Sequence, residues 1–320
     1  MELSLYSLAA AALALGIPSL AILLHQLPDR RRRRHLPGIE RVLILGASSG
    51  LGRSLALHYT RRGARVCVVA RRADKLKELA SEAEAEAAES SLLLSQVADM
   101  TAVEDMVRVR GAIEAAWGGL DTVHVCAGVS ALQPIMALTG RGADEDDGDA
   151  SEEGVRRAVE IAGRAMKGNF EGPLVAAVSF IPMLTRTSSS PAILLVSSAA
   201  AIIPAPTRAL YASSKAASLL LYQALAIEHQ NIAFSFVLPS TIEGNFRASA
   251  VDAGPVREVD PNKNGLKTEY VAKRCIDAVD RGVRGNIVIP WYYNLGPIVY
   301  SFWPSRIERA AAKKYNFAPA

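Results

Sequence analysis

Residues 41–52, Arg41-Val-Leu-Ile-Leu-Gly-Ala-Ser-Ser-Gly-Leu-Gly52, decide how this chain folds. The apolar run at 41–45 predicts a short buried strand, and residues 52–62 have the periodicity of a helix. Three glycines connect the two. A strand that turns through glycines into a helix is typical of a dinucleotide site, because glycine lets the backbone approach a pyrophosphate and the helix N-terminus offers free N–H groups.

The rest of the chain alternates strands with helices. Strands are expected at 65–70, 92–97, 122–126, 192–197, 232–238 and 286–290, and helices at 74–90, 101–116, 155–184, 210–229 and 268–281. This alternation predicts a doubly wound parallel α/β sheet of the Rossmann-like kind, forming one catalytic domain over residues 41–290. The long helix has a candidate break near Gly168. The acidic, glycine-rich stretch 139–154 is expected to be a solvated insertion.

The N-terminus has the features of a membrane anchor. No charged side chain lies between Glu2 and Asp29, so residues 1–28, with their apolar stretch 3–27, are long enough to cross a bilayer as a helix. Arginines 30–34 follow, in a basic linker over 29–40, and place the catalytic domain on the cytosolic side. Endoplasmic reticulum or lipid-droplet membranes fit this arrangement. Gly16-Ile17-Pro18 allows either a kinked spanning helix or a hairpin, and a secretory signal peptide is the rival interpretation.

Charge and cysteine content exclude some classes of protein. The net charge is +4, but residues 1–34 contribute most of it, so no basic surface for nucleic acid is expected on the folded domain. The three cysteines have no motif spacing. They predict neither a disulfide framework nor a metal site.

The second strand ends in Val69-Ala70-Arg71-Arg72, where an NAD site usually has an acidic residue. A guanidinium group at Arg71 suits a 2′-phosphate instead, so NADP(H) is the expected cofactor. For Arg72 the sequence also allows a purely solvated side chain.

Tyr211 and Lys215 lie four residues apart in an expected helix and therefore share one face of it. The pair alone carries little weight, because many helices contain one. Ser198 follows the strand at 192–197, and Asn169 stands in Gly168-Asn-Phe-Glu-Gly172. A tyrosine has a pKa of about 10, and a nearby lysine cation should lower that pKa, so the pair fits an acid and the cation that tunes it.

Taken together, these motifs resemble the short-chain dehydrogenase/reductase family over about residues 40–245. The resemblance rests on the glycine loop 46–52, on Asp99, on Cys126-Ala-Gly128, and on Asn169, Ser198 and Tyr211-Ala-Ser-Ser-Lys215. It implies NAD(P)-dependent oxidation of alcohols or reduction of carbonyls, and it allows a homodimer. The catalytic residues it implies are Asn169, Ser198, Tyr211 and Lys215. The cofactor-binding residues are Gly46, Ser48, Ser49, Gly50, Leu51, Gly52, Arg71, Asp99, Ala127, Gly128, Tyr211, Lys215 and Pro239.

By the same resemblance, Ser198 would bind the substrate oxygen, Lys215 the nicotinamide ribose, and Asn169 a water of the proton relay. Several positions depart from the family pattern. Leu45 replaces a threonine and Val125-Cys126 replaces two asparagines, which indicates a coupled change from polar to apolar. Ser240 and Gly244 depart as well, and they weaken the inference for contacts beyond Pro239.

The tail, residues 291–320, begins with the aromatic stretch 291–303 and continues into a basic helix at 306–314. The aromatic stretch fits a lid over an apolar substrate, a membrane interface, or a tail packed on the core. The leading interpretation is a membrane-anchored, NADP(H)-dependent carbonyl reductase or alcohol dehydrogenase acting on a lipid- or steroid-like substrate. The alternatives are a 3-ketosphinganine or 3-ketoacyl-type reductase, and a nucleotide-binding regulator without turnover.

Overall fold

The computed structural model describes residues 39–86, 92–140, 149–254, 256 and 260–318. The expected anchor, residues 1–28, and all of the expected linker except Ile39 and Glu40 lie outside these residues. Within the described part of the chain, no helix combines the length and apolar character needed to cross a bilayer.

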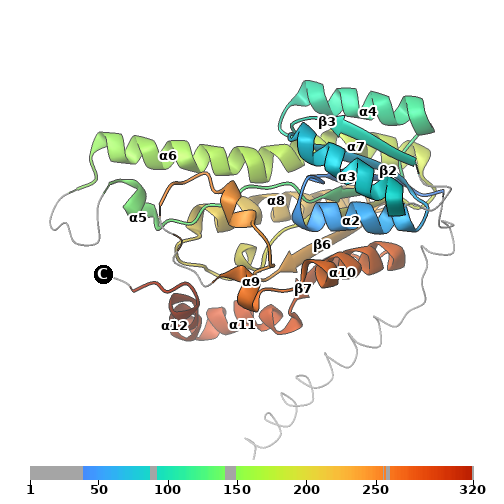
Figure 1. Cartoon of the computed structure of the whole chain (residues 1–320). Coiled ribbons are helices and arrows are strands. Elements are labelled where there is room, and N and C mark those ends of the chain that lie inside the picture. Colours follow the sequence, from blue (N-terminus) through green and yellow to red (C-terminus); the bar gives the residue numbers. More distant parts are fainter. Residues whose placement is uncertain (1–38, 87–91, 141–148, 255, 257–259, 319–320) are drawn as a thin grey trace, which may run out of the picture.

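Seven parallel strands form one sheet in the order β3-β2-β1-β4-β5-β6-β7 (Figure 1). The strands are β1 (Arg41–Leu45), β2 (Arg65–Ala70), β3 (Leu92–Val97), β4 (Thr122–Val125), β5 (Ala192–Val196), β6 (Ala233–Pro239) and β7 (Gly285–Ile289). The order reverses between β1 and β4. In open parallel sheets, ligands bind at such a switch point, beyond the carboxyl ends of the strands.

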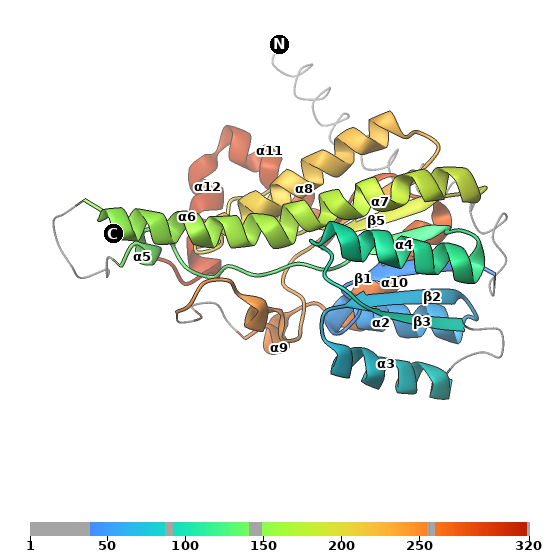
Figure 2. The same cartoon turned by 90° about the horizontal axis from the view of Figure 1, so that it is seen from above.

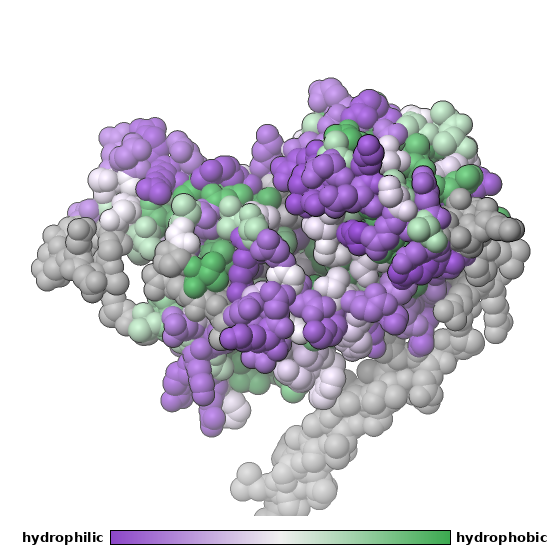
Figure 3. All heavy atoms as spheres, viewed as in Figure 1, coloured by the Kyte–Doolittle hydropathy of each residue, from purple (hydrophilic) through white to green (hydrophobic). Residues whose placement is uncertain are grey.

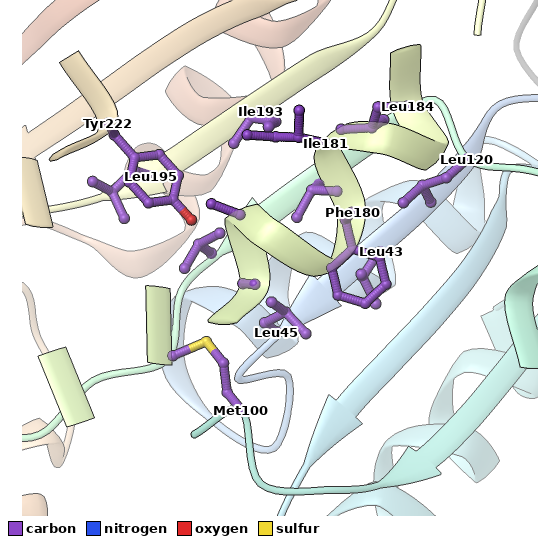
Figure 4. Close-up of a cluster of buried hydrophobic side chains, with 14 of the residues drawn as sticks. Leu43, Leu45, Met100, Leu120, Phe180, Ile181, Leu184, Ile193, Leu195 and Tyr222 are labelled. Atoms are coloured by element: carbon purple, nitrogen blue, oxygen red, sulfur yellow. The ribbon is translucent and has the colours of Figure 1, made fainter. Parts of the chain in front are cut away.

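Helices cover both faces of the sheet, so the doubly wound prediction is confirmed. On one face lie α2 (Gly50–Arg61), α3 (Ala73–Glu86) and α10 (Thr268–Arg281), packed on alternate strand residues such as Val42 and Ile44. On the other face lie α4 (Val103–Trp117), α7 (Gly172–Thr187) and α8 (Ala209–Glu228). Figure 4 shows Phe180, Ile181 and Leu184 of α7 directed at this second face, close to Leu43 and Ile193.

The expected break near Gly168 is a π-helical turn, so this prediction needs correction. Helix α6 (Glu152–Met166) continues through the π-helix η1 (Lys167–Glu171) into α7, and Figure 2 shows α6 and α7 as one long rod. A π turn inserts one residue without ending a helix. Helix α6 also begins inside the stretch expected to be a loop, because Ser151 accepts a capping hydrogen bond of 3.1 Å from Gly154 N. Residues 141–148 of that stretch lie outside the described residues.

Short elements that the sequence pattern did not predict complete the fold. They are α5 (Ile135–Leu138), the 3₁₀ turns η2 (Ala199–Ala201), η3 (Phe246–Ser249) and η4 (Trp291–Asn294), and the helices α9 (Pro261–Asn264) and α11 (Leu295–Phe302). The expected basic helix is present as α12 (Pro304–Lys314).

Candidate active site

Two loops meet at the switch point of the sheet. A Cβ built on Gly46 would lie 2.6 Å from Ala127 N, and one on Gly52 would overlap Gly46 O, so both positions require glycine. Cys126 N and Ala127 N each donate to Leu45 O at 2.9 Å. Leu45 and Val125 are register partners and both are buried, so apolar packing joins the loops where the family has polar residues. This pairing is consistent with a coupled change, and the coupling itself stays a prediction.

The glycine loop exposes the first turn of α2. Gly50 has φ +54°, in the left-handed region that favours glycine, and no side chain caps the helix at Ser49. The N–H groups of this turn are therefore available to an anion. Arg72 Nη2 donates to Ser48 Oγ and to Ser49 Oγ, both at 2.9 Å, which brings a guanidinium group to the same place.

Arg71 and Asp99 lie at the ends of β2 and β3, the position that the sequence predicted for them. Arg71 Nη1 is 3.8 Å from Asp99 Oδ2, and both side chains are exposed to solvent. Asp99 Oδ1 also accepts from Thr101 N at 2.9 Å, which fixes the turn that leads to α4.

Asn169 is fully buried in the π turn and holds the loop that follows β4. Its Oδ1 accepts from Val129 N at 2.8 Å, and its Nδ2 donates to Val129 O at 2.9 Å. Nδ2 also donates to Ser214 Oγ of α8 at 3.0 Å. The amide therefore joins the β4 loop to the helix that carries Tyr211 and Lys215.

Lys215 is 4% exposed and donates from Nζ to Val196 O at 3.0 Å, at the end of β5. Burial lowers the pKa of Lys215 to about 8. Burial likewise raises the pKa of the Cys126 thiol to about 12, so the thiol is neutral at physiological pH. A Cβ on Gly128 would lie 2.8 Å from Asn169 Oδ1 and 3.0 Å from Lys215 Nζ.

Tyr211 lies in the first turn of α8 and is 7% exposed. The guanidinium carbon of Arg208 lies 4.4 Å from its ring centroid, and the Phe246 ring makes a T-shaped contact with it at a centroid distance of 5.9 Å. Ser198 begins η2, directly after β5, and its Oγ accepts from Ala200 N at 3.2 Å. The four residues expected to be catalytic thus come from the N-cap of η2 after β5, the π turn and α8, which all meet at the carboxyl edge of the sheet.

The segment after β6 covers this edge. Pro239 ends β6, and the chain then passes through η3 and returns to the β4 loop. Ser130 N donates to Ser249 O at 3.2 Å, and Asp252 Oδ2 accepts from Leu132 N at 2.7 Å. These bonds hold Phe246 against Tyr211 and make residues 240–254 part of the site.

A family model for short chain dehydrogenases matches residues 40–253, which is more than half of the chain. The chain belongs to the short-chain dehydrogenase family. This family consists of oxidoreductases whose fold binds a nicotinamide cofactor, so the sequence-based assignment of family and fold is confirmed.

Two curated proteins are similar in sequence to this short-chain dehydrogenase. A short chain dehydrogenase of Pseudocercospora fijiensis is 28% identical over 208 residues, and the match covers 64% of this chain but 60% of that protein. The chain therefore spans about three fifths of that relative's length. The 11-beta-hydroxysteroid dehydrogenase-like 3 protein of Arabidopsis thaliana is 29% identical over 263 residues, 81% of this chain and 76% of that protein.

Among solved structures, the short-chain dehydrogenase resembles an alcohol dehydrogenase of the archaeon Thermococcus sibiricus complexed with 5-hydroxy-NADP. The TM-score is 0.61 at 22% identity, with 78% of this chain and 95% of that chain covered. At this identity, the likeness concerns the fold.

Sequence reasoning missed three residues of this short-chain dehydrogenase site. Arg72 contacts the glycine loop, whereas the sequence also allowed a solvated side chain. Arg208 and Phe246 lie against Tyr211 but belong to no motif of the sequence. An arginine three positions before the tyrosine on a helix start was the available signal for Arg208, because residues at this spacing are neighbours.

The residues of the short-chain dehydrogenase fit a nicotinamide dinucleotide. Gly46 and Gly52 leave no room for side chains, the first turn of α2 offers N–H groups, and Arg72 adds positive charge. The individual roles of the residues stay predictions.

Proposed function

We propose that this short-chain dehydrogenase interconverts a carbonyl and an alcohol on an apolar, lipid- or steroid-like substrate with NADP(H), and that Tyr211 is its acid and base. One observation carries the proposal. Helix α8 and the π turn bring Tyr211, Lys215 and Asn169 to the edge of the sheet where the glycine loop lies. A binding module without turnover would have no need for an acid beside a buried cation.

The proton chemistry follows from the surroundings of Tyr211. When bound, the nicotinamide supplies or accepts the hydride. Tyr211 donates a proton to the substrate oxygen during reduction and accepts one during oxidation. The ammonium group of Lys215, one helical turn away, favours the phenolate, and this effect requires the protonated lysine. Ser198, the N-cap residue of η2, hydrogen-bonds the same oxygen and orients it.

Asn169 acts in this proposal by holding the β4 loop. Its side-chain amide already engages Val129 and Ser214, so it keeps Gly128 and Lys215 in place. The water that the family resemblance assigns to Asn169 stays a prediction.

The preference for NADP(H) rests on two arginines. Arg72 donates hydrogen bonds to the hydroxyl groups of Ser48 and Ser49. Arg71 follows the end of β2, a strand that contains no acidic residue, and its partner Asp99 comes from the end of β3. A 2′-phosphate at this place would receive charge-assisted hydrogen bonds from either guanidinium group.

The apolar substrate is supported by side chains around Tyr211. The Phe246 ring lies beside the phenol at a centroid distance of 5.9 Å. The names of relatives such as the 11-beta-hydroxysteroid dehydrogenase-like 3 protein also support a steroid-like substrate in this proposal.

Membrane attachment through residues 3–27, with the catalytic domain in the cytosol at the endoplasmic reticulum or a lipid droplet, is part of the proposal. A second contact surface supports it. Leu295, Ile298 and Phe302 form one exposed stripe of α11, next to the basic helix α12, and Phe302 is 75% exposed. Figure 3 shows a small hydrophobic area among hydrophilic residues at the lower edge of the molecule, where Figure 1 places α11. Apolar and aromatic side chains beside positive charge suit a membrane interface.

A homodimer is also proposed, through the outer faces of α7 and α8. Val178, Leu220 and Ile227 are large apolar side chains that these helices expose. A dimer of this kind should sediment as a monomer after Leu220→Glu, and a wild-type chain that sediments as a monomer would exclude it.

The function is tested with the full chain in phospholipid vesicles, with NADPH and NADH, against apolar ketones and small water-soluble aldehydes. Faster reduction of the apolar ketones with NADPH supports the proposal. Equal rates on soluble aldehydes contradict the substrate class, and no turnover on any carbonyl or alcohol contradicts the enzyme.

A further inference from the structure

Arg208 lies over the ring of Tyr211 in a buried place. The guanidinium carbon is 4.4 Å from the ring centroid, and the exposed fractions of the two residues are 8% and 7%. Arginine is the cation that most often stacks on aromatic faces, and the attraction is stronger where water is excluded. Phe246 makes a T-shaped contact with the same ring, at an interplanar angle of 64°. The phenol ring is therefore held by a cation on its face and by a second contact with an aromatic ring.

The backbone before α8 directs Arg208 to this place. Thr207 is buried and has φ +63°, a conformation that β-branched residues rarely adopt. Arg208 N then donates to Ala205 O at 3.2 Å, and Arg208 O accepts from Ala212 N at 2.7 Å as α8 begins. Such strain persists only where the surrounding structure enforces it, and it concentrates at functional sites. The turn at Thr207 therefore fixes the start of the helix and the side chain that follows it.

We propose that Arg208 is a positioning residue that holds the Tyr211 ring and favours its phenolate form. The inference rests on the proposed role of Tyr211 as acid and base. It assigns to Arg208 a part of the tuning that the sequence assigns to Lys215 alone.

The charged groups around Tyr211 explain why Arg208, in addition to Lys215, matters for the phenolate form. Burial lowers the pKa of Lys215 to about 8, so in mildly alkaline solution this lysine loses its charge. Arginine keeps its charge at every pH at which proteins are folded. On the side of the β4 loop, burial raises the pKa of Cys126 to about 12, so its thiol adds no charge. The η3 segment that carries Phe246 also carries Arg247, whose charge has the same sign. Among the described residues, Arg208 is a cation in direct contact with the ring face.

The first test needs no cofactor or substrate. The tyrosinate absorbance of the full chain is titrated with alkali for wild type, R208M and R208K, and each curve is corrected with its own Y211F counterpart so that only Tyr211 remains. Removing a charge at this distance should raise the Tyr211 midpoint in R208M by about one pH unit or more, and R208K should restore most of the shift. R157M, which changes an exposed arginine of α6, is the matched control and should titrate like wild type. R208Q replaces R208M if the latter does not fold.

The second test uses turnover. In alcohol oxidation, the rate rises with pH as Tyr211 loses its proton, so the midpoint of kcat in R208M should move to higher pH by a similar amount, and kcat near neutrality should fall about tenfold. R208K should keep the wild-type midpoint. Equal Tyr211 midpoints in wild type and R208M would overturn the inference, as would an equal shift in R208K. If the wild-type chain has no turnover, the proposed function fails, but the absorbance titration still decides whether Arg208 tunes Tyr211.

Discussion

Gly128 faces the ammonium group of Lys215 so closely that a Cβ on the glycine would lie 3.0 Å from Nζ. The same Cβ would lie 2.8 Å from Asn169 Oδ1. In Gly128→Ala, both side chains must move, although each is buried and hydrogen-bonded. We expect kcat to fall at least about tenfold, because a displacement of this size at a catalytic group costs one to two orders of magnitude.

Gly111→Ala is the matched control for this prediction. Gly111 lies in α4 with open space around the added Cβ, so alanine should stabilise the helix by about 0.5–1 kcal/mol and leave kcat unchanged. Steady-state rates and urea unfolding of both variants check the pair. Wild-type kcat in Gly128→Ala would mean that Lys215 and Asn169 do not need their present positions.

Arg72→Ser should separate the two cofactors. A lost charge-assisted hydrogen bond costs about 1.5–3 kcal/mol, so the Kd for NADPH should rise about tenfold to a hundredfold while the Kd for NADH changes little. Arg71→Ser tests the arginine expected from the sequence in the same way. Arg186→Ser removes an exposed arginine that pairs with Glu114 and should alter neither Kd. Calorimetric titration measures all four proteins, and equal losses for both cofactors would contradict a 2′-phosphate site at Arg72.

Lys215→Met should stabilise the fold while it abolishes activity. Burial lowers the pKa of Lys215 from 10.5 to about 8, so the folded chain binds this proton more weakly than the unfolded chain does. The cost of the buried charge is fully present below pH 8 and disappears as the pH rises toward 10.5. That cost is about 3 kcal/mol, and the lost hydrogen bond to Val196 offsets about 1 kcal/mol of it.

Urea unfolding of Lys215→Met should therefore give a free energy about 2 kcal/mol above wild type at neutral pH, and the gain should shrink near pH 10. Lys75→Met, at an exposed position of α3, should show no such gain. A variant that is less stable than wild type at neutral pH would show that the buried ammonium group does not destabilise the fold.

The α11 surface predicts a membrane contact that tryptophan fluorescence can detect. Trp291 and Trp303 flank α11 and are exposed, whereas Trp117 packs against the core. In vesicles of anionic phospholipid with brominated acyl chains, the fluorescence of the full chain should be quenched. The double variant W291F and W303F should lose most of that quenching, because Trp117 alone remains. Quenching that persists in the double variant would place the membrane contact elsewhere.

The strands were the most predictable part of the fold. β1, β2 and β3 begin and end where the sequence predicted. For β1 and β2 the reason is that a strand buried on both faces needs apolar side chains at nearly every position, whereas β3 is a partly exposed edge strand. The pairing of Leu45 with Val125 could also be expected, since a change on one strand requires a matching change on its neighbour. The π turn could not, because Asn169 turns inward through contacts with Val129 and Ser214 that lie far away in the sequence.

The candidate site divides in the same way. Tyr211, Lys215, Ser198 and Asn169 belong to motifs with fixed spacing, and the fold brings them to one edge of the sheet. Arg208 and Phe246 depend on the turn at Thr207 and on the return of residues 240–254 to the β4 loop, which no local pattern records. Of the three interpretations of residues 291–303, a tail packed on the core fits Tyr293 and Gly296, which pack inward, whereas Trp291, Phe302 and Trp303 are exposed.

The most direct test of the catalytic claim compares wild type with Tyr211→Phe in the full chain. The substitution removes one hydroxyl group and keeps the ring between Arg208 and Phe246. We predict that Tyr211→Phe binds NADPH with the wild-type Kd and reduces an accepted apolar ketone at least about a thousandfold more slowly, since a positioned acid contributes about two to four orders of magnitude. A Tyr211→Phe variant that turns over at the wild-type rate would contradict the account.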